Sequence, residues 1–286
     1  MTARRSPTVR KRRLAAELRR LRKECGLTRE QVAERIGCAP VTITRIETGQ
    51  SGARVGEVSL MLEVYGVTGD EREALLQVAK DARKRGWWHP YSSTMPSWFQ
   101  VYVGLEEEAA SIQDYQPEVV PGILQVEAYA RATYLAEAIV PSEDEINRQT
   151  TLRMERQKRL LEADNAPEMW FVCNEAVIRR VVGGRNAMKD QLDWLVALSR
   201  QPNITIQVLP FTAGAHPGMQ GGFRILSFPE PADPAVVYVE YRRGSLYLEK
   251  VDDVHSYTLV FNHLRAQALG RDESRVLIAS AAQDMA

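Results

Sequence analysis

Cysteine is scarce in this sequence: three occur among 286 residues, and no two of them form a Cys-x-x-Cys pair. Such a set excludes a disulfide framework and a zinc finger, and it is typical of a reducing compartment. We expect Cys25, Cys38 and Cys173 to be small core residues. Long apolar runs are also missing, so the sequence predicts no membrane-spanning helix, no secretory signal and a cytoplasmic location.

Histidine and the short motifs of catalysis are equally sparse. His255 and His263 are eight residues apart, whereas paired zinc ligands are spaced by about three to five. The glycine pairs lie outside any Gly-x-Gly-x-x-Gly or Gly-x-x-x-x-Gly-Lys pattern, and no Gly-x-Ser-x-Gly occurs. We therefore expect no metal, no cofactor and no catalytic residue.

Charge is balanced overall but unevenly distributed. Residues 1–85 hold 19 Lys and Arg against 11 Asp and Glu, whereas the rest of the chain holds 18 against 26. The densest stretch, Arg4–Lys23, contains ten basic residues and one acidic residue. Basic charge is thus concentrated where it can meet phosphate, although such a run can equally be a solvated helix face.

Apolar periodicity predicts five short helices in these first 85 residues. The first, over residues 10–25, carries Leu14, Leu18 and Leu21 on one face, and Gly26 is placed to end it. Two later helices have apolar faces at the following positions: Val58, Met61, Leu62 and Tyr65, and then Leu75, Leu76, Val78 and Ala79.

A tight turn joins the second and third helices. Thr28 can cap the second helix, and Gly37 breaks it. Pro40 then opens a third helix within two or three residues. The positions predicted to face inward are Val32, Ala33 and Ile36 in the second helix and Ile43 and Ile46 in the third. Two helices joined in this way predict a helix-turn-helix.

The segment Leu27–Gly37 reads LTREQVAERIG, and Val41–Gly49 reads VTITRIETG. Over about residues 14–80 the sequence resembles the Cro and phage-repressor regulators, also called the xenobiotic-response-element family. The resemblance rests on the small Ala33, the glycine at the turn and the Ile-Glu-x-Gly ending. It implies a five-helix, lambda-repressor-like domain that binds duplex DNA.

The resemblance further implies that the third helix lies in the major groove and exposes its early residues to base edges. Those residues are Pro40, Val41, Thr42, Thr44 and Arg45. Arg45 can present two donors to guanine O6 and N7, with a phosphate contact as the alternative. Val41 can touch a thymine methyl group, and the two threonines can bond a base or a phosphate.

Other residues are expected to hold the DNA backbone. Thr28 and Arg29 stand at the start of the second helix, where family members contact phosphate and backbone amides favour it as well. Arg54 can make a similar contact or can simply be exposed. Arg22 and Glu47 are expected to form a structural bridge between the first and third helices.

The segment 86–116 is rich in aromatic residues and is predicted to be a linker with a connecting helix over Ser97–Tyr115. Glu106, Glu107 and Glu108 on that helix form an expected acidic patch. Packing between domains is favoured over base stacking for the aromatic residues.

Residues 117–286 are predicted to form an α+β domain with a small sheet. Apolar, β-branched runs between Pro, Gly and Asn predict four strands: 169–173, 204–209, 223–228 and 236–241. The predicted helices cover 123–139, 142–163, 187–200 and 254–269.

This second part is similar to a bacterial group of regulators with a shared C-terminal domain described as antitoxin-like. The matching pieces are Gly86-Trp87-Trp88, Pro121–Gln125 with Tyr129–Ala132, Arg153-Met154 with Arg156-Gln157, and Gln207–Phe211. The resemblance suggests a small acidic protein encoded nearby as a partner.

The sequence therefore predicts a sequence-specific, duplex-DNA-binding transcription regulator. One small helix-turn-helix covers little DNA, so a homodimer on inverted half-sites is expected. The second domain is expected to dimerise or to sense a partner or an effector. The alternative is that the second domain is an enzyme of unrecognised type.

Overall fold

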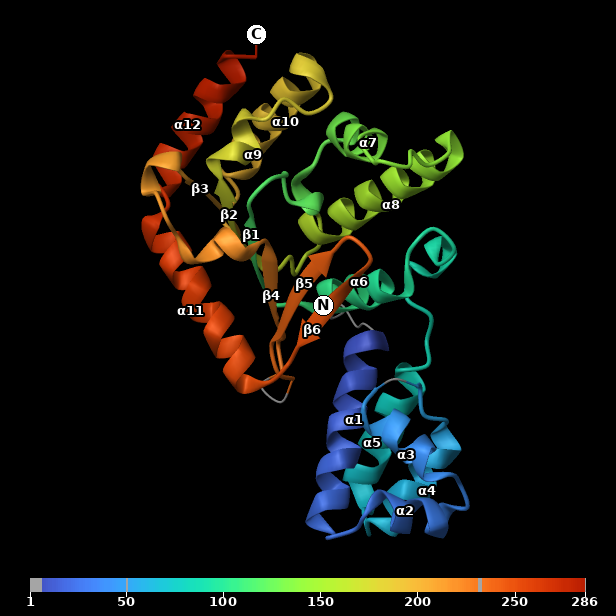
Figure 1. Cartoon of the computed structure of the whole chain (residues 1–286). Coiled ribbons are helices and arrows are strands. Elements are labelled where there is room, and N and C mark those ends of the chain that lie inside the picture. The colour runs from blue at the N-terminus through green and yellow to red at the C-terminus, as the bar shows by residue number, and fades with distance from the viewer. Residues whose placement is uncertain (1–6, 50, 231–232, 286) are drawn as a thin grey trace. The chain divides into compact units, whose positions relative to one another are not determined.

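The computed structural model describes residues 7–49, 51–230 and 233–285. The chain divides into two compact units, one ending at His89 and the other beginning at Pro90, and each is described here by itself (Figure 1). None of the helices in the described ranges is long and apolar enough to cross a membrane.

The first unit consists of helices, as expected. In chain order they are α1 (Pro7–Glu24), α2 (Arg29–Ile36), α3 (Pro40–Glu47), α4 (Val55–Val64) and α5 (Gly69–Asp81). Helix α1 begins earlier than the predicted residue 10 and takes up Val9, which is buried. The N-terminal residues 1–6, with Arg4 and Arg5, lie outside the described ranges.

A single apolar core holds these five helices together. The predicted inward residues of α1, Leu14, Leu18 and Leu21, are all buried there, as are Ile43 and Ile46 of α3. Five short helices cannot each be stable alone in water, so burial of these faces supplies most of their stability.

The second unit is α+β, which confirms the predicted class. Its helices are α6 (Ser97–Glu108), α7 (Glu127–Leu135), α8 (Glu143–Leu161), α9 (Glu175–Arg179), α10 (Gly184–Leu198), α11 (Val251–Gln267) and α12 (Arg271–Gln283). Its strands are β1 (Ser111–Gln116), β2 (Glu168–Asn174), β3 (Ile204–Leu209), β4 (Phe223–Ser227), β5 (Val236–Tyr241) and β6 (Gly244–Leu248).

The six strands form one mixed sheet in the order β3-β2-β1-β4-β5-β6 (Figure 1). Strands β1, β2 and β3 run parallel, and β4, β5 and β6 add antiparallel pairs. Helices connect the parallel strands, because a parallel pair needs a long crossover. The sheet thus changes from parallel to antiparallel between β1 and β4.

The predicted helix Ser97–Tyr115 is wrong in its second half. Helix α6 ends at Glu108, and Ser111–Gln116 is strand β1, which pairs with both β2 and β4. The strand has the sequence SIQDYQ, in which only Ile112 and Tyr115 are apolar, and Asp114 is buried through its pair with Arg224, so no apolar run reveals it. Strand β6 and helix α12 were also not predicted.

Successive residues along each strand point to opposite faces of the sheet. On one face Tyr115, Phe223 and Val237 pack with Phe261 and Leu264 of α11. On the other face Asp114, Arg224 and Tyr238 lie side by side in register across β1, β4 and β5. This second face carries the charge.

Helix α6 covers that charged face. Its Tyr102 ring lies 4.4 Å from the ring of Tyr238, and Phe99 stacks on Tyr102 at 5.6 Å. These aromatic residues of the predicted linker therefore belong to the core of the second unit. Of the three cysteines, Cys173 is buried and Cys38 is partly buried against the core of the first unit, whereas Cys25 is exposed, so the expectation was wrong for Cys25.

Candidate nucleic-acid interface

Helix α2 begins with a reciprocal cap. The Gln31 backbone N–H donates to the Thr28 hydroxyl at 3.2 Å, and the Thr28 backbone N–H donates to the Gln31 side chain at 2.9 Å. The predicted cap at Thr28 is confirmed. Its hydroxyl is thereby tied to the helix end, where orphan amides favour a phosphate.

The turn between α2 and α3 is set by two residues. Gly37 adopts the left-handed conformation with φ 71° and returns its N–H to carbonyls of α2, which ends the helix. Pro40 occupies the first turn of α3, where its missing N–H costs nothing. Both predicted roles are confirmed, and they fix the angle at which α3 leaves the turn.

Helix α3 presents an exposed face opposite the core. Pro40, Val41 and Arg45 are exposed, and Thr42 and Thr44 are partly exposed. Val41 is 52% exposed. The five residues predicted to meet DNA thus share one accessible surface. At eight residues, α3 is about 12 Å long, close to the width of the major groove.

The threonine hydroxyls of α3 are already used in part. The Thr44 hydroxyl donates to the Pro40 carbonyl at 3.2 Å, and the Thr48 hydroxyl donates to the Thr44 carbonyl at 2.8 Å. In this arrangement the Thr44 hydroxyl can accept a hydrogen bond from DNA but does not donate one. Arg45, in contrast, forms no ion pair or side-chain hydrogen bond with the described residues, so its guanidinium is available.

A buried carboxylate joins three elements behind this face. The carboxylate of Glu47, at the end of α3, accepts hydrogen bonds from Arg22 Nε at 2.6 Å and from Arg22 Nη2 at 3.0 Å. Arg29 Nε of α2 donates to the same carboxylate at 2.9 Å. The predicted bridge between Arg22 and Glu47 is confirmed. Arg29 joins it, which the sequence did not reveal.

These contacts shift the pKa values of their members. Burial alone would raise the pKa of Glu47, but the hydrogen bonds from Arg22 and Arg29 outweigh it and hold this pKa below its usual value. The hydrogen bond to Glu47 raises the pKa of Arg22. The carboxylate therefore stays ionised and fixes α3 against α1 and α2.

Arg54 lies at the start of α4 and is exposed. Its backbone N–H donates to Glu57 at 2.8 Å, while its side chain forms no ion pair within the described ranges. Arg54 is therefore placed to meet an external anion. Arg29 is less free, because its Nε is bound to Glu47.

The basic run of α1 is partly neutralised within the unit. Arg10 pairs with Asp81 at 2.9 Å, Arg22 pairs with Glu47, and Arg20 binds both Glu17 and Glu24. These arginines carry less uncompensated charge than the sequence count suggests. Arg13, Arg19 and Lys23 of α1 are exposed and form no ion pair within the described ranges, so α1 keeps part of its basic surface.

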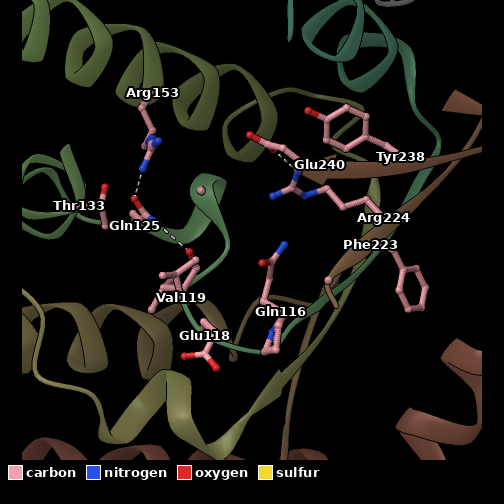
Figure 2. Close-up of a pocket in the computed structure, with 14 residues that line it drawn as sticks. Gln116, Glu118, Val119, Gln125, Thr133, Arg153, Phe223, Arg224, Tyr238 and Glu240 are labelled. Atoms are coloured by element: carbon pink, nitrogen blue, oxygen red, sulfur yellow. Dashed lines mark hydrogen bonds and ion pairs between the residues drawn. The ribbon is translucent and has the colours of Figure 1, made fainter. Parts of the chain in front are cut away.

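The second unit holds a cavity of about 350 Å³ at the carboxyl end of β1. Its wall is made by the segment after β1, by α7 and α8 and by β4 and β5. Figure 2 shows Arg153 extending from α8 toward Gln125 and Arg224 beside Glu240. Both arginines line the cavity.

Buried ion pairs lie on the same face of the sheet. Arg156 donates to both oxygens of Glu106, at 2.8 and 2.9 Å. Arg224 pairs with Asp114 at 3.0 Å and with Glu240 at 3.4 Å. Glu106 was expected in an exposed acidic patch. That expectation was wrong, because Glu106 is 2% exposed and neutralised by Arg156.

Residues 99–280 match the family model described as a domain of unknown function (DUF5753), over more than half of the chain. The chain belongs to the DUF5753 family. Residues 13–75 match the model of a helix-turn-helix domain, and this match suggests a DNA-binding regulator. Comparisons with curated proteins and with solved structures gave no significant match.

The matched residues 99–280 contain the motifs of the second resemblance except Gly86-Trp87-Trp88, which precedes them. Gln125 and Arg153 come together at the cavity, although 28 residues separate them in the sequence, whereas Arg156 pairs with Glu106. Asp114, Arg224 and Glu240 were not predicted as functional residues. The only feature of the sequence that marks these three residues is a charged side chain within a strand. In the described part of this DUF5753 chain, no three His, Cys, Asp or Glu side chains gather as metal ligands.

Proposed function

We propose that this chain is a sequence-specific, duplex-DNA-binding transcription regulator of the Cro and phage-repressor type. Helix α3 enters the major groove, and Arg45 reads a guanine. The observation that carries the proposal is the exposed face of α3, where Arg45 has no partner among the described residues and Val41 is 52% exposed. A free guanidinium next to an exposed methyl-bearing residue suits the edges of guanine and thymine.

Arg54, Arg29 and Thr28 position the domain on the backbone. Arg54 supplies an exposed cation, and the start of α2 supplies backbone amides beside Thr28. Arg29 has a double role: one nitrogen holds Glu47, and its remaining N–H groups face outward to phosphate, because the side chain is 33% exposed. These contacts set register and orientation, and Arg45 supplies sequence discrimination.

The test is a selection of bound sequences from randomised duplexes with the full chain. We expect an enriched motif of two inverted half-sites, each with a guanine whose enrichment depends on Arg45. The chain with Arg54→Ala is the matched control, because it should bind more weakly and select the same motif. Recovery of no enriched motif, with wild-type chain that binds duplex DNA, would contradict sequence-specific recognition.

We propose a regulatory role, and not a catalytic one, for the DUF5753 domain. Burial raises the pKa of Cys173, so this thiol is not a thiolate nucleophile. The buried carboxylates Glu106 and Asp114 are engaged by arginines and are not free to act as a general base. These carboxylates are thus held in ion pairs, which favours a binding role of the domain over a catalytic one.

The antitoxin-like resemblance supports a small acidic protein encoded nearby as a further partner. Co-expression of that gene neighbour with the full chain, followed by size-exclusion chromatography, tests this partner. Elution of the two proteins at separate volumes would count against it.

A further inference from the structure

Arg153 is a cation that lacks a carboxylate partner among the described residues. It extends from α8, donates from Nη1 to the Gln125 side-chain carbonyl, and lies 4.8 Å above the centre of the Tyr134 ring. Its Nε is buried and finds no hydrogen-bond acceptor in the described ranges. A guanidinium has five N–H donors, so most of the binding capacity of Arg153 is unused.

The other charged groups that line the cavity are paired. Arg224 is neutralised by Asp114 at 3.0 Å, and Glu240 lies 3.4 Å from Arg224. Glu118 is bound by Arg180 at 2.6 Å. Arg224 thus serves two carboxylates, Asp114 and Glu240, and Arg153 has no carboxylate at ion-pair distance among the described residues.

The charge of Arg153 is partly withdrawn from water and has no ion pair among the described residues. Burial lowers the pKa of Arg153, and the like charges of Arg156 and Arg224 act in the same direction, whereas Tyr134 and Glu240 act against them. Arginine does not lose its proton at neutral pH, so the cost remains in the folded domain. An anion bound at Arg153 would remove that cost.

The cavity has the size and the lining of a small-molecule site. Its volume of about 350 Å³ falls in the range of ligand pockets, which is roughly 300 to 1,000 Å³. Pro117, Val119 and Val120 give it apolar wall, and Thr133 adds a hydroxyl. Gln125 is held by its bond to the Val120 carbonyl at 2.7 Å, so it fixes the direction of the guanidinium.

We propose that this cavity binds a small organic acid whose carboxylate pairs with Arg153. The unused N–H donors of one guanidinium match the two oxygens of a singly charged carboxylate, whereas a phosphate would bring about two negative charges toward Glu240 and Glu118. The two oxygens of the carboxylate accept from the planar guanidinium, and the apolar wall takes the carbon body of the acid. This inference rests on the proposed regulatory function, for which it names the ligand class.

The test follows the arginine Nε–H signals of the full chain by nitrogen-15 NMR. Benzoate and inorganic phosphate serve as probes at matched ionic strength. We expect benzoate to shift one arginine Nε–H signal in a saturable manner, and this signal should vanish in Arg153→Met. The same response should persist in Arg159→Met, a control on the partly exposed side of the same helix.

Three results would overturn the inference. They are no saturable shift with benzoate, a response that survives in Arg153→Met, and tighter binding of phosphate than of benzoate. The first two exclude Arg153 as an anion site, and the third excludes a carboxylate as its ligand.

Thermal unfolding separates a ligand-binding arginine from a structural one. Arg153→Met should keep or raise Tm, because it removes a partly buried charge that forms no ion pair among the described residues. Arg156→Met should lower Tm, because it leaves Glu106 buried without its cation. Equal losses of Tm in the two variants would make Arg153 structural and would overturn the inference.

The affinity for the selected duplex is then measured with and without saturating benzoate. A change that is lost in Arg153→Met supports both the site and its regulatory role. Binding of benzoate with unchanged DNA affinity would leave the carboxylate site standing, while the proposed regulatory function would fail.

Discussion

The carboxylate of Glu47 accepts two hydrogen bonds from the guanidinium of Arg22, which lies 25 residues earlier in the chain. The side chain of Glu47 is completely buried, and this pair ties the end of α3 to α1. Its geometry is the bidentate one in which both oxygens of a carboxylate meet parallel N–H groups. The position of the proposed recognition helix therefore depends on an ion pair that does not touch DNA.

Glu47→Gln should destabilise the first unit by about 3 kcal/mol, because it leaves the Arg22 guanidinium partly buried without its counter-charge. Hydrogen exchange of the buried Ile43 and Ile46 amides measures this loss. Glu34→Gln, at an exposed position of α2, is the control and should change exchange little. Equal protection in Glu47→Gln and wild type would show that the pair does not stabilise α3.

The contribution of Glu47 should depend on pH. Its pKa is lowered in the folded chain, so the stabilisation is fully present above the unfolded value of about 4.3 and is lost as pH falls through the folded pKa. The stability difference between wild type and Glu47→Gln should be constant near neutrality and shrink below about pH 4. A difference that stays constant through the acid range would contradict the lowered pKa.

Arg45→Ala should cost about 1 to 3 kcal/mol on the selected site and flatten the preference at one base pair. Arg45→Lys should still bind but discriminate less, because it keeps the charge and loses the planar fork. Equilibrium titrations on the site and on single-base variants measure both effects. If Arg45→Ala weakens all duplexes equally, Arg45 contacts phosphate instead of a base.

DNA binding should weaken steeply with salt, because each phosphate contact releases counterions. Arg54→Ala should reduce the slope of log affinity against log salt by about one and leave sequence preference unchanged. Arg29→Ala should do the same and should also weaken protection of α3, since Arg29 holds Glu47. An affinity that hardly changes between low and moderate salt would exclude the electrostatic contacts.

The chain should bind its site as a homodimer, with recognition helices roughly 34 Å apart along the duplex. One short helix such as α3 buries too little DNA surface for tight specific binding. Light scattering of the full chain, alone and on the selected duplex, measures the stoichiometry. A single chain per duplex would contradict the proposal.

The sequence alone determined the architecture of the first unit. Thr28, Gly37 and Pro40 act through hydrogen bonds and dihedral angles within a few residues, so their roles could be predicted without knowing the fold. Apolar periodicity predicted the buried faces of the five helices for the same reason. Once the buried face of α3 was predicted, the remaining positions of this helix could be predicted to be exposed.

Only the tertiary structure decided the roles of residues whose partners are distant in the chain. Ser111–Gln116 is a strand because β2 and β4 pair with it, and no local pattern reveals such pairing. Arg153 and Arg156 are three residues apart on α8, yet Arg156 meets Glu106 and Arg153 meets no carboxylate among the described residues. The free energy of a charge removed from water depends on the partner groups that the fold brings close to it, so these two arginines differ in role.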